Sequence, residues 1–105
     1  MVDLNQKDWT KQLNEDNNSV VLDVRTQEEL DELGKIPNAV HIDLFKGQGF
    51  IEEVQQLDAN KNYYVYCRAG GRSVQACAIM NQLGFANTYN LLGGFTEWEG
   101  EVDNN

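Results

Sequence analysis

The sequence has 105 residues, 41% of them hydrophobic and 24% charged, a length and composition that support one folded domain over residues 1–105. Its 17 acidic residues outnumber the 8 basic ones, and the net charge of −9 repels nucleic-acid phosphates and anionic lipid headgroups. The longest apolar runs have five residues, whereas a membrane helix needs about 20. We therefore expect neither nucleic acid nor a membrane as a partner.

The first third of the chain predicts a helix, a turn and a strand. Asp3 or Asn5 can cap a short helix that carries Trp9 and Leu13 on one side. Residues 19–24 (SVVLDV) form a β-branched run without helical periodicity, which is typical of a parallel strand buried on both faces. This run is the first candidate for a central strand.

The middle of the chain continues the alternation. Thr26 and Glu29 have the spacing of a capping box and open a short acidic helix that Gly34 closes. Residues 39–42 follow a Pro-Asn turn and predict a second strand. Apolar side chains then recur at helical spacing over residues 50–57, which indicates an amphipathic helix.

The last part of the chain contains the strongest local signals. Residues 63–67 (YYVYC) predict a strand, residues 73–83 a helix of about three turns, and residues 88–92 another strand. A final helix is expected around Phe95 and Trp98. Strand and helix alternate at least four times, which favours an α/β fold: a mostly parallel sheet of four to five strands with helices on both faces.

The loop between the strand of residues 63–67 and the next helix carries the candidate chemistry. It holds, in order, Cys67, Arg68, Ala69, Gly70, Gly71, Arg72 and Ser73. Two glycines let such a loop curl and point its N–H groups inward as an anion cradle, at the sheet edge where α/β proteins bind ligands. Two arginines and a helix N-terminus favour thiolate over thiol. We therefore interpret Cys67 as a nucleophile rather than a small core residue.

At this loop the sequence resembles the rhodanese-like family of single-domain sulfurtransferases, and the resemblance covers nearly the whole chain. Residues 23–25 (DVR), the acidic pair at 28–29 and residues 34–39 (GKIPNA) are similar to the family's N-terminal signature, and residues 92–98 (LGGFTEW) to its C-terminal signature. Lys35 and Asn38 replace the family's usual histidine and glycine. Both lie outside the catalytic loop and bear on local turn geometry and surface contacts.

The resemblance implies a mechanism without cofactor or metal. The Cys67 thiolate would take the outer sulfur of a donor such as thiosulfate, and the resulting persulfide would pass that sulfur to cyanide or a thiol. The N–H groups of residues 68–73 would bind the transferred sulfur, while Arg68 and Arg72 would attract the anionic donor.

Two alternatives remain open at this stage. The domain could be a non-catalytic or relay module that hands persulfide to a protein partner. A cysteine-dependent phosphatase or arsenate reductase is the minor alternative, because such enzymes place an arginine six positions after the cysteine. Here Arg72 lies five positions after Cys67, which makes a smaller ring that suits one sulfur atom.

Other reactive residues receive structural interpretations. Cys77 could resolve a persulfide into a disulfide, but its apolar neighbours predict packing, and both cysteines are read as thiols. His41 alternates with apolar residues along a strand, and the family resemblance implies that Asp23 and Arg25 form an ion pair that fixes neighbouring loops. One histidine and two cysteines are too few for a zinc site. Residues 1–12 carry no export signal, so a cytoplasmic location is expected, and the acidic tail of residues 101–105 is expected to be frayed.

Overall fold

The computed structural model describes residues 1–69 and 71–104. Its centre is a sheet of five parallel strands in the order β1-β5-β4-β2-β3. The strands are β1 (Val2–Leu4), β2 (Ser19–Asp23), β3 (Val40–His41), β4 (Asn62–Tyr66) and β5 (Thr88–Leu91). The predicted α/β class and parallel sheet are confirmed. β1 was not expected, because its three residues were interpreted only as a helix cap.

Four α-helices connect or follow these strands: α1 (Gln6–Glu15), α2 (Gln27–Leu33), α3 (Gln48–Val54) and α4 (Gly71–Gln82). Asn5 caps α1, since its side chain accepts a hydrogen bond from the Asp8 N–H at 2.8 Å. Thr26 and Glu29 form the predicted capping box of α2. Local signals of the sequence therefore start both helices where they were expected.

The predicted last helix is only a 3₁₀ turn, Phe95–Glu97, and a second such turn covers Leu44–Lys46. In the Phe95–Glu97 turn, the first two N–H groups donate to carbonyl oxygens elsewhere in the fold. Phe95 donates to Cys67 and Thr96 donates to Arg68, each at 2.9 Å. Trp98 then adopts an extended conformation and ends the turn. Tertiary contacts therefore replace the α-helix that the sequence indicates.

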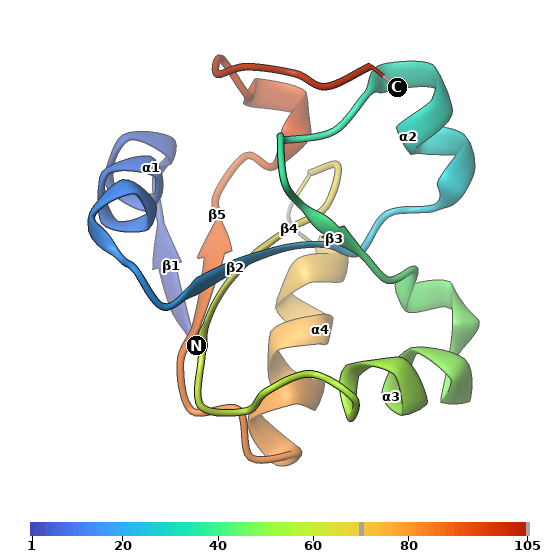
Figure 1. Ribbon diagram of the computed structural model, residues 1–105. Coiled ribbons are helices and arrows are strands. Elements are labelled where there is room, and N and C mark those ends of the chain that lie inside the picture. The colour runs from blue at the N-terminus through green and yellow to red at the C-terminus, as the bar shows by residue number, and fades with distance from the viewer. Residues whose placement is uncertain (70, 105) are drawn as a thin grey trace.

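Two apolar layers form on opposite faces of the sheet. Figure 1 shows α1 on one side and α3 and α4 on the other. Alternation along β4 sends Tyr63 and Val65 into the layer beneath α3 and α4, and Tyr64 and Tyr66 into the layer beneath α1. Cys67 directly follows β4 and continues the first set. This alternation aims its side chain at α4.

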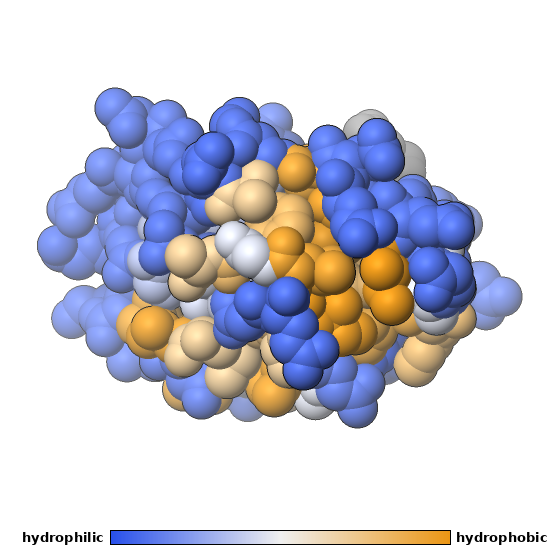
Figure 2. All heavy atoms as spheres, turned by 90° about the horizontal axis from the view of Figure 1, so that it is seen from below, coloured by the Kyte–Doolittle hydropathy of each residue, from blue (hydrophilic) through white to orange (hydrophobic). Residues whose placement is uncertain are grey.

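The layer beneath α3 and α4 reaches the surface at the end of the molecule opposite the carboxyl ends of the strands. Figure 2 views that end and shows apolar surface in its middle with polar surface around it. Partly buried side chains pack on this layer: Val20, Ile51, Leu57, Ala59, Ile79 and Leu83.

Within the part of the chain that the structure describes, no helix has the length and apolar character to cross a membrane.

The C-terminal segment pairs with the loop after α2 at Asp103, while residue 105 of the tail predicted to be frayed lies outside the described residues. The Lys35 N–H donates to the Asp103 carbonyl at 2.9 Å, and the Asp103 N–H donates to the Lys35 carbonyl at 2.8 Å. Gly34 permits this approach, because a Cβ there would lie 2.5 Å from the Val102 side chain. Backbone pairing therefore fixes the segment at Asp103.

Candidate active site

Cys67 lies at the carboxyl edge of the sheet, where β4 ends. Its side chain is 1% exposed. Its Sγ lies 3.4 Å from the Oγ of Ser73, a residue in the first turn of α4. The N–H groups and dipole at the start of a helix favour negative charge on a neighbouring group. The sulfur therefore lies next to the positive end of the α4 dipole.

The loop after Cys67 is held by Phe95 and Thr96, which follow the glycine pair of the C-terminal signature. The Phe95 N–H donates to the Cys67 carbonyl, and Thr96 donates to the Arg68 carbonyl through its N–H at 2.9 Å and its hydroxyl at 2.7 Å. Gly94 has a φ of +55°, and a Cβ there would lie 2.6 Å from the Arg68 carbonyl oxygen. Only glycine permits this approach.

Arg72 is bound by a carboxylate of α2. Its two terminal nitrogens donate to the two Glu29 oxygens at 2.6 and 2.8 Å, and its side chain is 19% exposed. These hydrogen bonds are the main reason that the pKa of Glu29 falls to about 2, with a further contribution from Thr26. Glu29 thus serves both the capping box and the loop.

The charge of Arg72 also acts on Cys67. The pKa of Arg72 is raised, first because Glu29 accepts its hydrogen bonds and also because negative charge on Glu29 and Cys67 favours the protonated form. Such an interaction is reciprocal, so the charge of Arg72 favours negative charge on the Cys67 sulfur.

The structure distinguishes two arginines that the sequence presented as equivalent. Arg68 is exposed, and its guanidinium makes no hydrogen bond or ion pair with residues 1–69 or 71–104. Ala69 and Gly71 are also exposed, and Gly71 begins α4. Gly70, the remaining loop residue of the prediction, lies outside the described residues.

Sequence reasoning missed a buried polar partner of the loop. Ser73 is fully buried, and its hydroxyl donates to Asn90 Oδ1 on β5 at 2.5 Å. The Asn90 amide nitrogen in turn donates to Asp3 Oδ1 on β1 at 2.9 Å. A polar residue inside a buried strand was the available signal for Asn90. For Glu29, the capping-box spacing was visible but gave no indication of Arg72.

The residues interpreted as structural have structural partners. Cys77 is fully buried, and burial raises its pKa to about 11. His41 Nε2 lies 2.6 Å from the Arg25 carbonyl oxygen. The predicted ion pair of Asp23 and Arg25 is confirmed at 2.7 Å, fully buried, with the Tyr66 hydroxyl as a further donor to Asp23. Among the described residues, no group of three or more His, Cys, Asp and Glu side chains has the arrangement of a metal site.

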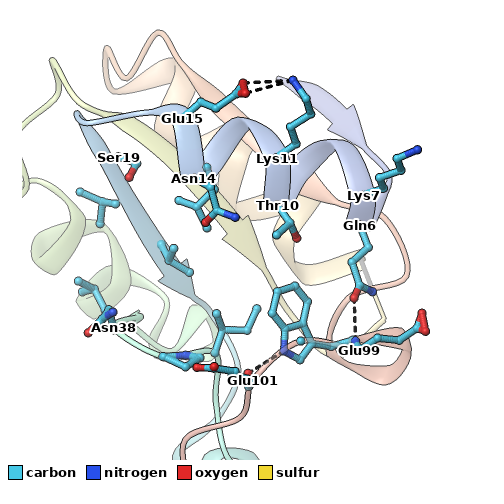
Figure 3. Close-up of a pocket in the computed structure, with 18 residues that line it drawn as sticks. Gln6, Lys7, Thr10, Lys11, Asn14, Glu15, Ser19, Asn38, Glu99 and Glu101 are labelled. Atoms are coloured by element: carbon cyan, nitrogen blue, oxygen red, sulfur yellow. Dashed lines mark hydrogen bonds and ion pairs between the residues drawn. The ribbon is translucent and has the colours of Figure 1, made fainter.

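A groove of about 1250 Å³ lies away from Cys67, between α1, the β2–β3 side of the sheet and the C-terminal segment (Figure 3). Lys11 of α1 lies on one wall, and Gln6 of α1 lies toward the end formed by Glu99 and Glu101, where the Glu99 N–H donates to Gln6 Oε1 at 2.7 Å. None of the described loop residues from Cys67 to Ser73 lines it. The candidate chemistry therefore belongs to the loop and not to this groove.

The chain matches a family model and several known proteins. A model of the rhodanese-like domain matches residues 6–101. The YtwF protein of Bacillus subtilis, named as a candidate sulfurtransferase, is 43% identical over 83 residues, which cover 78% of this chain and 75% of that protein. The thiosulfate sulfurtransferase GlpE of Coxiella burnetii is 35% identical over 80 residues, covering 76% and 71%.

A solved structure gives the same result for the fold. The crystal structure of a rhodanese-like domain protein from Staphylococcus aureus matches with a TM-score of 0.81 and 28% identity, over 96% of this chain and 94% of that chain. The resemblance seen in the three sequence signatures is thereby confirmed over nearly the full length. The chain belongs to the rhodanese-like domain family.

Proposed function

We propose that this sulfurtransferase moves sulfane sulfur through a persulfide on Cys67. The thiolate attacks the outer sulfur of thiosulfate, the sulfur–sulfur bond of the donor breaks, and sulfite leaves with the bonding electron pair. Cyanide or a thiolate then attacks the outer sulfur of the persulfide, and the Cys67 thiolate is restored. The protein needs no general base for either displacement once Cys67 is ionised.

One observation carries this proposal: the Cys67 sulfur lies beside the first turn of α4, 3.4 Å from Ser73 Oγ, within the field of the Arg72 guanidinium. Both surroundings favour an anionic sulfur in the thiolate and persulfide states. Arg68 is exposed and unpaired among the described residues, so it is the cation available to attract thiosulfate. The names of the relatives support transfer of sulfur in general.

The phosphatase and arsenate reductase alternative has less support. The sixth position after Cys67 is Ser73, which is buried and bonded to Asn90 and supplies no guanidinium for a phosphoryl group. Arg72, at the fifth position, already binds Glu29. The loop therefore suits a single sulfur atom better than a tetrahedral oxyanion such as phosphate or arsenate.

Relay of sulfur to a protein acceptor is a second candidate. Phe45 is 69% exposed, and its ring lies 5.3 Å from the Arg72 guanidinium. An exposed aromatic ring beside a catalytic loop is typical of a contact with another protein. A protein thiol would then replace cyanide as acceptor in the second step.

The activity test is thiocyanate formation from thiosulfate and cyanide, with Cys67→Ser as the matched control. We expect turnover by the wild-type protein and none by the variant. Equal thiocyanate formation by both proteins, above the uncatalysed rate, would remove Cys67 from the mechanism.

A further inference from the structure

Three polar side chains connect the Cys67 sulfur to the edge strand β1. Ser73 Oγ lies 3.4 Å from Cys67 Sγ and 2.5 Å from Asn90 Oδ1. Asn90 Nδ2 lies 2.9 Å from Asp3 Oδ1. Ser73 is 0% and Asn90 1% exposed, so bulk water does not compete for these two groups. The connection therefore runs from β1 through β5 to the first turn of α4.

The chemistry of the partners sets the direction of each hydrogen bond. A carboxylate only accepts, so the amide nitrogen of Asn90 must face Asp3 and its amide oxygen must face Ser73. An amide oxygen also only accepts, so the hydrogen between Asn90 and Ser73 belongs to the Ser73 hydroxyl. A hydroxyl has one hydrogen. Ser73 therefore offers a lone pair, and no hydrogen from its hydroxyl, to the Cys67 sulfur.

We propose that Asn90 is a positioning residue that withholds the Ser73 hydroxyl hydrogen from Cys67, with Asp3 fixing the orientation of the Asn90 amide. In this arrangement Ser73 accepts a hydrogen bond from the Cys67 thiol. The Ser73 hydroxyl can donate to a Cys67 thiolate only if it first breaks its hydrogen bond to Asn90. The buried amide oxygen of Asn90 then lacks that donor, which costs free energy. Asn90 thus restrains ionisation of Cys67, against Arg72 and the α4 N-terminus. The proposal rests on the proposed role of Cys67 as the sulfur-carrying nucleophile.

The main test is alkylation of Cys67 by iodoacetamide as a function of pH in Asn90→Leu. Leucine has a similar shape but neither accepts from Ser73 nor donates to Asp3. The substitution changes none of the charged or titratable groups around Cys67: Asp3, Arg68, Arg72 and Cys77. We expect the pH midpoint of alkylation to be lower in Asn90→Leu than in the wild-type protein. Below that midpoint the alkylation rate should rise about fivefold, which corresponds to the free energy of one neutral hydrogen bond.

A double-mutant cycle decides whether the effect passes through Ser73. In a Ser73→Ala background, Asn90→Leu should leave the alkylation midpoint unchanged. An equal shift in both backgrounds, or an unchanged or higher midpoint in Asn90→Leu alone, would overturn the proposal. Circular dichroism and thermal unfolding check that each variant is folded.

A second measurement does not depend on the folding of an Asn90 variant. In Cys77→Ala, which leaves one thiol, the infrared S–H band at a pH where Cys67 is protonated should lie at lower frequency than in Cys77→Ala/Ser73→Ala. The same frequency in both proteins would contradict the proposed thiol donor. Neither readout uses a sulfur donor, so a failure of sulfur transfer is distinguishable from a failure of this proposal.

Discussion

Arg72 of the candidate catalytic loop and Glu29 of α2 are 43 positions apart in sequence and share two hydrogen bonds, at 2.6 and 2.8 Å. The Glu29 carboxylate also accepts from the Thr26 N–H at 3.0 Å as part of the capping box. One side chain therefore starts a helix and holds the arginine whose charge reaches Cys67.

The Glu29–Arg72 pair predicts a particular acid sensitivity. The folded-state pKa of Glu29 is about 2, below its ordinary 4.5, first because Arg72 donates hydrogen bonds to it. A lowered pKa means that the pair's stability contribution is complete above about pH 4.5 and is lost as the pH falls toward about 2. It amounts to at most about 3 kcal/mol. Urea unfolding between pH 4.5 and pH 2 measures the free energy of unfolding, which should fall less in Glu29→Gln than in the wild-type protein. An identical fall in both proteins would contradict the stabilising role of the pair.

Arg68 should determine attraction of the donor without contributing to stability. We expect Arg68→Ala to raise KM for thiosulfate about two- to fivefold, because an exposed cation acts on the donor mainly through a screened charge. The free energy of unfolding should change by less than about 0.5 kcal/mol.

Lys11→Ala is the control for Arg68→Ala, because Lys11 is an exposed cation on α1 that pairs with Glu15. Steady-state kinetics at low and high salt measure the effect. A KM change of equal size in Lys11→Ala would show that overall charge is responsible and not the position of Arg68.

Gly94 should be required for its close approach as well as for its positive φ. Gly94→Ala places a Cβ 2.6 Å from the Arg68 carbonyl oxygen and must displace the loop. We expect a loss of about 2 kcal/mol or more in unfolding free energy and of about tenfold or more in sulfur transfer.

Gly47→Ala provides a matched control for Gly94→Ala. Gly47 has a φ of +58°, close to the +55° of Gly94, but nothing lies within 4 Å of the position its Cβ would occupy. Its substitution should cost about 1–3 kcal/mol from backbone strain and leave sulfur transfer unchanged. Equal losses of activity in both variants would show that the contact with Arg68 is unimportant.

Cys77 should remain unmodified under conditions that alkylate Cys67. Its pKa of about 11, raised by burial, leaves almost no thiolate near neutral pH. Intact mass should show one iodoacetamide adduct per folded chain and two after unfolding. Cys77→Ala should retain most of the sulfur transfer, and a loss as large as that of Cys67→Ser in a folded protein would favour a two-cysteine mechanism.

The features that could be predicted from the sequence depend on neighbouring residues. The capping box of Thr26 and Glu29 and the position of Cys67 after a strand are both readable within a few positions. β1 depends on pairing with β5, more than 80 positions away, and three residues carry too weak a pattern. The contacts of Ser73 with Asn90 and of Arg72 with Glu29 likewise join distant segments. The loop was therefore predictable, whereas the residues that orient it were not.

The central claim is that Cys67 carries the transferred sulfur. Its most direct test is the intact mass of the protein before thiosulfate, after thiosulfate, and after subsequent cyanide. We predict that the wild-type protein and Cys77→Ala gain the mass of one sulfur atom and lose it again with cyanide, while Cys67→Ser gains none. No added sulfur on the wild-type protein, or the same gain on Cys67→Ser, would contradict the account.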